Sequence, residues 1–228
     1  QIAAVILCIA LNALDGFDVL AISFAAPGIA AEWGISRGAL GIVLAMELIG
    51  MTAGSVVLGN IADNLGRRPI ILGCLVVMAS GMYLASQATS VNALLATRFV
   101  TGVGIGGMLA TTNAMVAEYS NARHRNFNVV LMATGYPVGI IIGGSLATIL
   151  LAHFDWRAVF ILGAAMTGVL LPAIWFLMPE SISYLAQKKR PDALAQINRI
   201  LTRMGHAVLE QLPASEEKST GWRDLFSP

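Results

Sequence analysis

The stretch GNIADNLGRRP, residues 59–69, separates two long apolar segments of the chain. In a hairpin this short between two membrane helices, the backbone N–H and C=O groups must form their hydrogen bonds with the helix ends and with charged side chains at the water boundary. Lys and Arg in short loops stay on the cytoplasmic side of a membrane. Arg67 and Arg68 therefore predict a cytoplasmic turn, which orients the helices before and after it.

The composition predicts a membrane protein. Of the 228 residues, 57% are hydrophobic and only 12% are charged, against about 25% charged in ordinary soluble domains. A hydrocarbon core of about 30 Å needs about 20 apolar residues of helix. Six stretches qualify, so we expect an all-α bundle of six transmembrane helices within residues 1–178: 2–26, 38–62, 69–87, 91–117, 127–152 and 156–178.

The basic residues indicate the topology. Most of the 14 Lys and Arg residues follow the second, fourth and sixth spans, whereas Arg37 and Arg157 lie at the opposite span ends. This asymmetry predicts that both termini of the segment lie in the cytoplasm. The membrane is expected to be the inner (plasma) membrane of the cell. Trp33, Trp156 and Trp175 fall near span ends, as interface anchors do.

Residues 179–228 are polar and are expected to form a cytoplasmic segment. A short amphipathic helix is predicted from Pro191 to a stop at Gly205, because proline favours the first turn and glycine the end of a helix. It is too short to span a membrane and is expected to lie at the interface. Residues 213–221 are expected to be a linker.

Two carboxylates interrupt the first apolar span. A carboxylate near the bilayer centre costs roughly 2.5 to 3.5 kcal/mol, so such groups usually face protein or a water cavity. Asp15 and Asp18 are three residues apart and share a helix face with Asn12. We expect one of them to exchange a proton or to position substrate. The alternative is a structural carboxylate that caps a break in the helix.

Two further charges lie inside apolar spans. Glu47 is a second possible proton carrier, or else a protonated and inert side chain. Arg98 is expected about 10 Å deep in the fourth span, at 1.5 Å per residue, and Asp15 at a comparable depth. A buried cation with a carboxylate partner could bind an anionic substrate, or form a purely structural ion pair.

Charges at the two predicted cytoplasmic turns could form ion pairs that lock one conformation and break as the helices rock. The alternative is that these charges set only the topology. The residues of this predicted gate are Gly59, Asp63, Gly66, Arg67 and Arg68 at the first turn and Glu118, Arg123 and Arg125 at the second.

Glycine patterns favour close helix packing. Gly102, Gly104 and Gly107 match the dinucleotide fingerprint, but no strand precedes them. Gly135, Gly139 and Gly143, and Gly50 with Gly54, repeat every four residues as packing faces do. No metal-ligand spacing or Ser/His/Asp set is present, so we expect no enzyme, cofactor, metal or nucleic-acid partner.

Several of these motifs resemble the major facilitator superfamily. GNIADNLGRRP resembles the loop signature between its second and third helices, although Asn64 stands where the family usually has a basic residue. Arg98 with Gly102 and Gly104 is similar to its fourth-helix motif, and residues 179–185 resemble the PESPRWL-like sequence after its sixth helix. Residues 15–18, D-G-F-D, resemble the first-helix motif of the aromatic acid:proton symporters.

The resemblance implies half of a twelve-helix fold, the amino-terminal six helices, composed of two inverted three-helix repeats. Its partners would be the missing carboxy-terminal six-helix half, the lipid bilayer, a small-molecule substrate and protons. The implied function is proton-coupled uptake of an aromatic acid such as a hydroxybenzoate by alternating access, with Asp15 and Asp18 in the coupling and substrate role. A major facilitator transporter for a sugar, another metabolite or a drug, and a non-transporting membrane module, remain alternatives.

Overall fold

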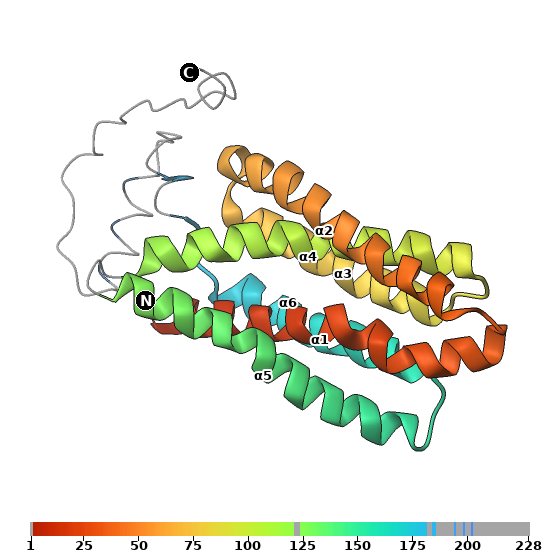
Figure 1. The fold of residues 1–228 in the computed structure, drawn as a ribbon. Helices are drawn as coiled ribbons and strands as arrows, with labels where there is room; N and C mark the ends of the chain where they lie inside the picture. The colour runs from red at the N-terminus through yellow and green to blue at the C-terminus, as the bar shows by residue number, and fades with distance from the viewer. Residues whose placement is uncertain are drawn as a thin grey trace. The chain divides into compact units, whose positions relative to one another are not determined.

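The computed structural model describes residues 2–120 and 124–181, together with residues 184, 185, 194, 198 and 202. All six helices within this part of the chain are long and apolar enough to cross a membrane. The helices lie side by side in one compact unit that ends at Ser181 (Figure 1). They are α1 Ile2–Trp33, α2 Arg37–Leu65, α3 Arg67–Ser86, α4 Val91–Tyr119, α5 Arg125–Leu151 and α6 Arg157–Leu177.

Six spans were predicted and six are present in the described part of the chain, but the first was predicted too short. Helix α1 runs through Pro27 to Trp33 instead of ending at residue 26. Gly34 follows it, with a φ of 61°, and donates its backbone N–H to the carbonyl oxygen of Ala30 at 2.9 Å. The alternative that an aspartate caps a break in the helix is also wrong, because α1 is continuous through Asp15 and Asp18.

Gly66 alone joins α2 to α3. Its φ of 102° lies in the region that side chains disfavour, and its N–H donates to the carbonyl oxygen of Ala62 at 2.9 Å. Gly66 therefore allows α3 to begin at Arg67 with no intervening loop. This turn defines one end of the bundle, called here the α2–α3 end. The opposite end, where α1 meets α2, is called the α1–α2 end (Figure 1).

The helices pack in a repeated pattern. Helix α2 packs mainly on α4, helix α1 mainly on α5, and α3 on both α4 and α6. If α1, α2 and α3 are matched in order with α4, α5 and α6, the contact between α2 and α4 corresponds to the contact between α5 and α1. This is the pattern that two inverted three-helix repeats produce.

Glycines bring the backbones of these helix pairs together. A methyl group on Gly102 or Gly106 of α4 would clash with a carbonyl oxygen of α2, at Glu47 and Met51 respectively. A methyl group on Gly16 of α1 would clash with the carbonyl oxygen of Tyr136 on α5, and one on Gly139 with that of Ala13. The expected role of the glycine repeats in close packing is confirmed.

Some predicted elements lie outside the described residues. They are Arg123 of the predicted gate, the interfacial helix predicted from Pro191 to Gly205 except residues 194, 198 and 202, and the linker 213–221.

The glycine contacts predict a specific loss of stability. Gly106→Ala should lower the free energy of unfolding by about 1–3 kcal/mol, because the new methyl group forces α2 and α4 apart. The measurement is the thermal unfolding midpoint of the full-length protein in detergent. Gly73→Ala on exposed α3 backbone, with nothing within 4 Å, is the control. Equal midpoints for the two variants would contradict the proposed packing.

Candidate functional site

A buried arginine lies at the centre of the candidate site. Arg98 on α4 is fully buried, and its Nη1 lies 3.4 Å from Oε1 of Glu47 on α2. Its Nη2 lies 2.9 Å from the sulfur of Met82 and 3.3 Å from the hydroxyl of Thr101. The Nε atom has no hydrogen-bond partner within the described part of the chain. Among the described residues, the guanidinium therefore forms an ion pair with one carboxylate, at one edge.

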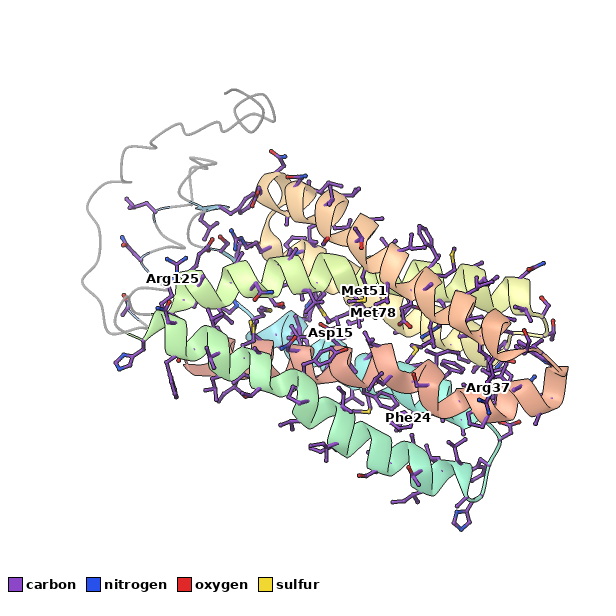
Figure 2. The ribbon with its side chains drawn as sticks, in the orientation of Figure 1. Asp15, Phe24, Arg37, Met51, Met78 and Arg125 are labelled. Carbon is purple, nitrogen blue, oxygen red and sulfur yellow. The ribbon has the colours of Figure 1, made fainter. Side chains whose placement is uncertain are left out.

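The two aspartates of α1 are also buried, and Figure 2 shows Asp15 within the helical bundle. Asp18 lies against α6, since a methyl group on Gly163 would come within 3.1 Å of its Oδ1. Arg98 and Glu47 lie within electrostatic range of Asp18, which in turn lies within range of Asp15. Among the described residues, no group donates a hydrogen bond to either oxygen of either aspartate.

The partner of Arg98 is therefore Glu47 and not Asp15. Arg98 and Asp15 were expected at comparable depth in the membrane, because α1 was expected to end at residue 26. At 1.5 Å per residue, Asp15 lies about 27 Å from Trp33 at the end of α1, and Arg98 about 10 Å from Val91 at the start of α4. The expected equal depth is wrong, and Asp18 is the aspartate closer to the level of Arg98.

Asn12, the third polar side chain expected on this face, ties α1 to α5. Its Nδ2 donates to the carbonyl oxygen of Met132 at 2.8 Å. A side-chain hydrogen bond between helices inside a membrane adds roughly 0.6 to 2 kcal/mol. Asn12 therefore holds the face that carries Asp15 against the neighbouring helix.

A second group of charges lies at the α2–α3 end. Nη2 of Arg67 lies 2.8 Å from Oε1 of Glu118 on α4, and 3.8 Å from Oδ1 of Asp63 one turn earlier. Asp63 is 69% exposed, whereas Arg67 and Glu118 are mostly buried. The predicted ion pair between the two turns is therefore present, and it joins α3 to α4.

The amino-terminal end of α3 is capped by Glu180, which follows α6. Oε1 of Glu180 accepts the backbone N–H groups of Arg67 at 2.9 Å, of Arg68 at 3.1 Å and of Ser181 at 2.9 Å. The first N–H groups of a helix lack partners within the helix and carry partial positive charge, so a carboxylate is stabilised there. The hydroxyl of Ser181 donates to Oε2 of Glu118 at 2.6 Å.

The remaining members of the predicted gate play smaller parts. Gly59 approaches Ala110 of α4, and Gly66 makes the α2–α3 turn. Arg68 donates from Nη2 to the carbonyl oxygen of Trp175. Arg125 is exposed at the start of α5, at the opposite end of the bundle from Arg37 (Figure 2). No ion pair joins Arg125 to another residue in 2–120 or 124–181.

Comparison with known proteins identifies the family. The model of the Major Facilitator Superfamily matches residues 7–228. The chain belongs to the major facilitator superfamily. Members are transporters, and the six helices described above are consistent with an integral membrane protein.

Relatives within the superfamily include transporters of aromatic acids. The gallate transporter of Pseudomonas putida is 33% identical over 204 residues, covering 88% of this chain and 44% of that protein. The 4-hydroxybenzoate transporter PcaK of Acinetobacter baylyi is 34% identical over 200 residues, covering 87% and 43%. PcaK of Pseudomonas putida is 29% identical and covers 98% and 50%. The chain spans about half the length of the curated relatives it matches.

A solved structure supports the fold. The proton:xylose symporter XylE, bound to 6-bromo-6-deoxy-D-glucose, superposes with a TM-score of 0.76 at 18% identity. The match covers 89% of this chain and 51% of XylE. It shows that the six helices have the arrangement of half of a major facilitator transporter.

Sequence reasoning missed the contributions of Glu180 and of α6. Glu180 stands in the PESPRWL-like segment, so the motif was visible, but its contact with the start of α3 depends on the fold. Phe160, whose ring centroid lies 4.9 Å from Cζ of Arg98, gave no sequence signal within an apolar span. Within the described residues, no three His, Cys, Asp or Glu side chains are close enough to hold a metal ion.

The buried pair predicts an asymmetry between single and double variants. Arg98→Met should lower the free energy of unfolding by about 3–5 kcal/mol, because it leaves Glu47 buried without its partner. The double variant Arg98→Met with Glu47→Gln should recover part of that loss. Thermal unfolding of the full-length protein in detergent measures both.

The control is Arg37→Met at the exposed start of α2, which should change stability by no more than about 0.5 kcal/mol. A double variant less stable than Arg98→Met alone would show that Glu47 and Arg98 do not stabilise one another.

Proposed function

We propose that this chain is the amino-terminal half of a transporter that takes up a small aromatic acid together with protons by alternating access. The observation that carries the proposal is a chain of buried charges, in which Arg98 pairs with Glu47, Asp18 lies within electrostatic range of both, and Asp15 lies within range of Asp18. The aromatic acid transporters among the relatives support this substrate class over a sugar or a drug. The partner that completes the transporter would be a second, carboxy-terminal six-helix half.

The charge of the cluster explains why protons would be needed. Asp15, Asp18 and Glu47 are all buried, and Arg98 can neutralise only one of them. An unpaired charge inside a membrane protein costs several kcal/mol, so proton binding to a carboxylate is strongly favoured when the cluster is closed. An anionic substrate near the cluster would add negative charge. Proton binding and anion binding would therefore stabilise one another.

The residues would have distinct roles in this mechanism. Asp15 and Asp18 would exchange the transported proton, since neither receives a hydrogen bond from the described residues. Glu47 would hold Arg98, and Arg98 would set the charge balance of the cluster. Direct contact between Arg98 and a substrate carboxylate would require the surrounding helices to move, because Arg98 is fully buried here.

The α2–α3 end would be the cytoplasmic gate. The basic residues at this end favour the cytoplasmic side of the inner membrane, with both termini of the segment there. The ion pair of Arg67 with Glu118 and the hydrogen bond from the backbone N–H of Arg67 to Glu180 both lie within this one half. They would hold the ends of three helices together as one surface, and exposed Asp63 would be free to meet the other half.

Transport assays test the proposed coupling. Full-length protein in proteoliposomes should accumulate labelled 4-hydroxybenzoate when an inward proton gradient is imposed, and should not accumulate labelled sugars. Asp15→Asn and Asp18→Asn should each abolish this accumulation, because asparagine cannot bind and release a proton. Asp15→Glu, which keeps an ionisable group, should retain part of the activity. Full accumulation in both Asn variants would refute the role of the aspartates.

The gate makes a separate kinetic prediction. Glu118→Gln removes a partly buried ion pair worth about 1 kcal/mol, so the maximal uptake rate should change by about fivefold. The KM for 4-hydroxybenzoate should stay the same, because the pair lies at the end of the bundle and not at its centre. Initial rates over a range of substrate concentrations measure both. A changed KM with an unchanged maximal rate would contradict a gating role.

A further inference from the structure

A compact polar cluster ties α1 to α6 at the α1–α2 end of the bundle. Both carboxylate oxygens of Glu32 are engaged by Arg157, from Nη1 at 2.7 Å and from Nη2 at 2.8 Å. Nε1 of Trp156 donates to Oε2 of the same carboxylate at 2.6 Å. We call Glu32, Trp156 and Arg157 the clasp. It joins the last turn of α1 to Trp156, the N-cap residue of α6, and to Arg157, the first residue of that helix.

The clasp continues into the bundle as a stack of aromatic rings. Trp156 is buried and packs edge-on against Trp33, with ring centroids 5.4 Å apart, and against Phe160, with centroids 5.8 Å apart. Trp156 also fills the space beside Gly28, where a methyl group would come within 2.9 Å of its Cβ. Edge-to-face aromatic pairs of this kind stabilise a fixed ring geometry.

Phe160 connects this stack to the charge cluster. Its ring is fully buried, with Cζ of Arg98 4.9 Å from the ring centroid. A cation over an aromatic face is attracted to it, and more strongly when both are desolvated. The pair of Arg98 with Glu47 is long at 3.4 Å, and the ring of Phe160 contacts the face of the guanidinium while Met82 and Thr101 contact its Nη2.

We propose that Phe160 is a positioning residue for Arg98, and that the clasp holds Phe160 in place through Trp156. A change in the clasp near the surface would then alter the position of Arg98 in the buried charge cluster, through Trp156 and Phe160. This proposal rests on the transport function proposed above only for its uptake assay. The proposal gives Phe160 and the clasp a positioning role, in which they neither bind the proton nor contact the substrate.

Charged and titratable groups from several helices surround Arg98. Asp18 of α1 and Glu47 of α2 lie within its electrostatic range, and Asp15 lies within range of Asp18. Beyond them, Cys74 of α3 and Tyr136 of α5 lie within range of Asp15. The contact of α6 with Arg98 is the uncharged ring of Phe160.

The pH profile of uptake tests the role of Phe160. Phe160→Leu removes the ring face, so Arg98 should stabilise the ionised carboxylates less well. The carboxylates should then bind protons at higher pH, and the pH of half-maximal 4-hydroxybenzoate uptake should rise by about 0.5 unit. Phe160→Tyr, which keeps the ring, should follow the parent profile.

A matched control is Phe176→Leu on the same helix, at a side chain that is 80% exposed, and it should leave the profile unchanged. If Phe160→Leu does not fold, Phe160→Met carries the same test. An unchanged profile for the Phe160 variant, or an equal rise in Phe176→Leu, would overturn the proposal.

A double-variant comparison tests the clasp. Glu32→Ala removes the acceptor of both Arg157 and Trp156 and should raise the pH midpoint in the same direction. If the clasp acts through Phe160, then Glu32→Ala combined with Phe160→Leu should give the same midpoint as Phe160→Leu alone. Additive shifts would show that the clasp acts independently of Phe160 and would overturn that half of the proposal.

A measurement without substrate separates this proposal from the proposed function. The thermal unfolding midpoint of the purified full-length protein should depend on pH through the same carboxylates. Its inflection should move to higher pH in Phe160→Leu and not in Phe176→Leu. If the parent takes up no aromatic acid but this shift is seen, the transport function fails and the positioning role stands. If no shift is seen, the positioning role fails whatever the transport result.

Discussion

The burial of Arg98 inside an apolar bundle is the constraint on which the rest of the site depends. A guanidinium cannot be deprotonated in a protein, so its charge must be met by nearby groups. Glu47 meets it at one edge and the ring of Phe160 at its face, while Asp18 lies within electrostatic range. Together with Arg98 itself, these groups come from four helices, α1, α2, α4 and α6. One fixed positive charge therefore links most of the bundle to the carboxylates proposed to carry protons.

Close glycine contacts make this arrangement possible. Gly102 lies against the carbonyl oxygen of Glu47 itself, so the contact that brings α2 to α4 also sets the distance between Glu47 and Arg98. Gly163 similarly leaves room for Asp18 beside α6. Membrane helices gain little from hydrophobic association, so small residues that allow close approach carry much of their packing energy. The same glycines therefore serve stability and the geometry of the site.

Much of this could be predicted from the sequence, because apolar length and basic loops report membrane spans directly. The six helices and the ion pair at the α2–α3 end were predicted, as were the charged residues of the cluster. The end of α1 was missed because Pro27 and Gly28 resemble a helix stop, whereas proline is tolerated in membrane helices. The partner of Arg98, the cap by Glu180 and the contact with Phe160 depend on which helices are neighbours. Local sequence carries no such information.

The most direct test of the account measures proton movement with substrate. Addition of 4-hydroxybenzoate to weakly buffered, de-energised proteoliposomes containing the full-length protein should make the external medium alkaline, because protons enter with the anion. Protein-free liposomes, which report passive entry of the free acid, provide the baseline, and Asp15→Asn should not exceed it. Substrate uptake by the parent without any pH change above that baseline would contradict the claim that the buried carboxylates couple transport to protons.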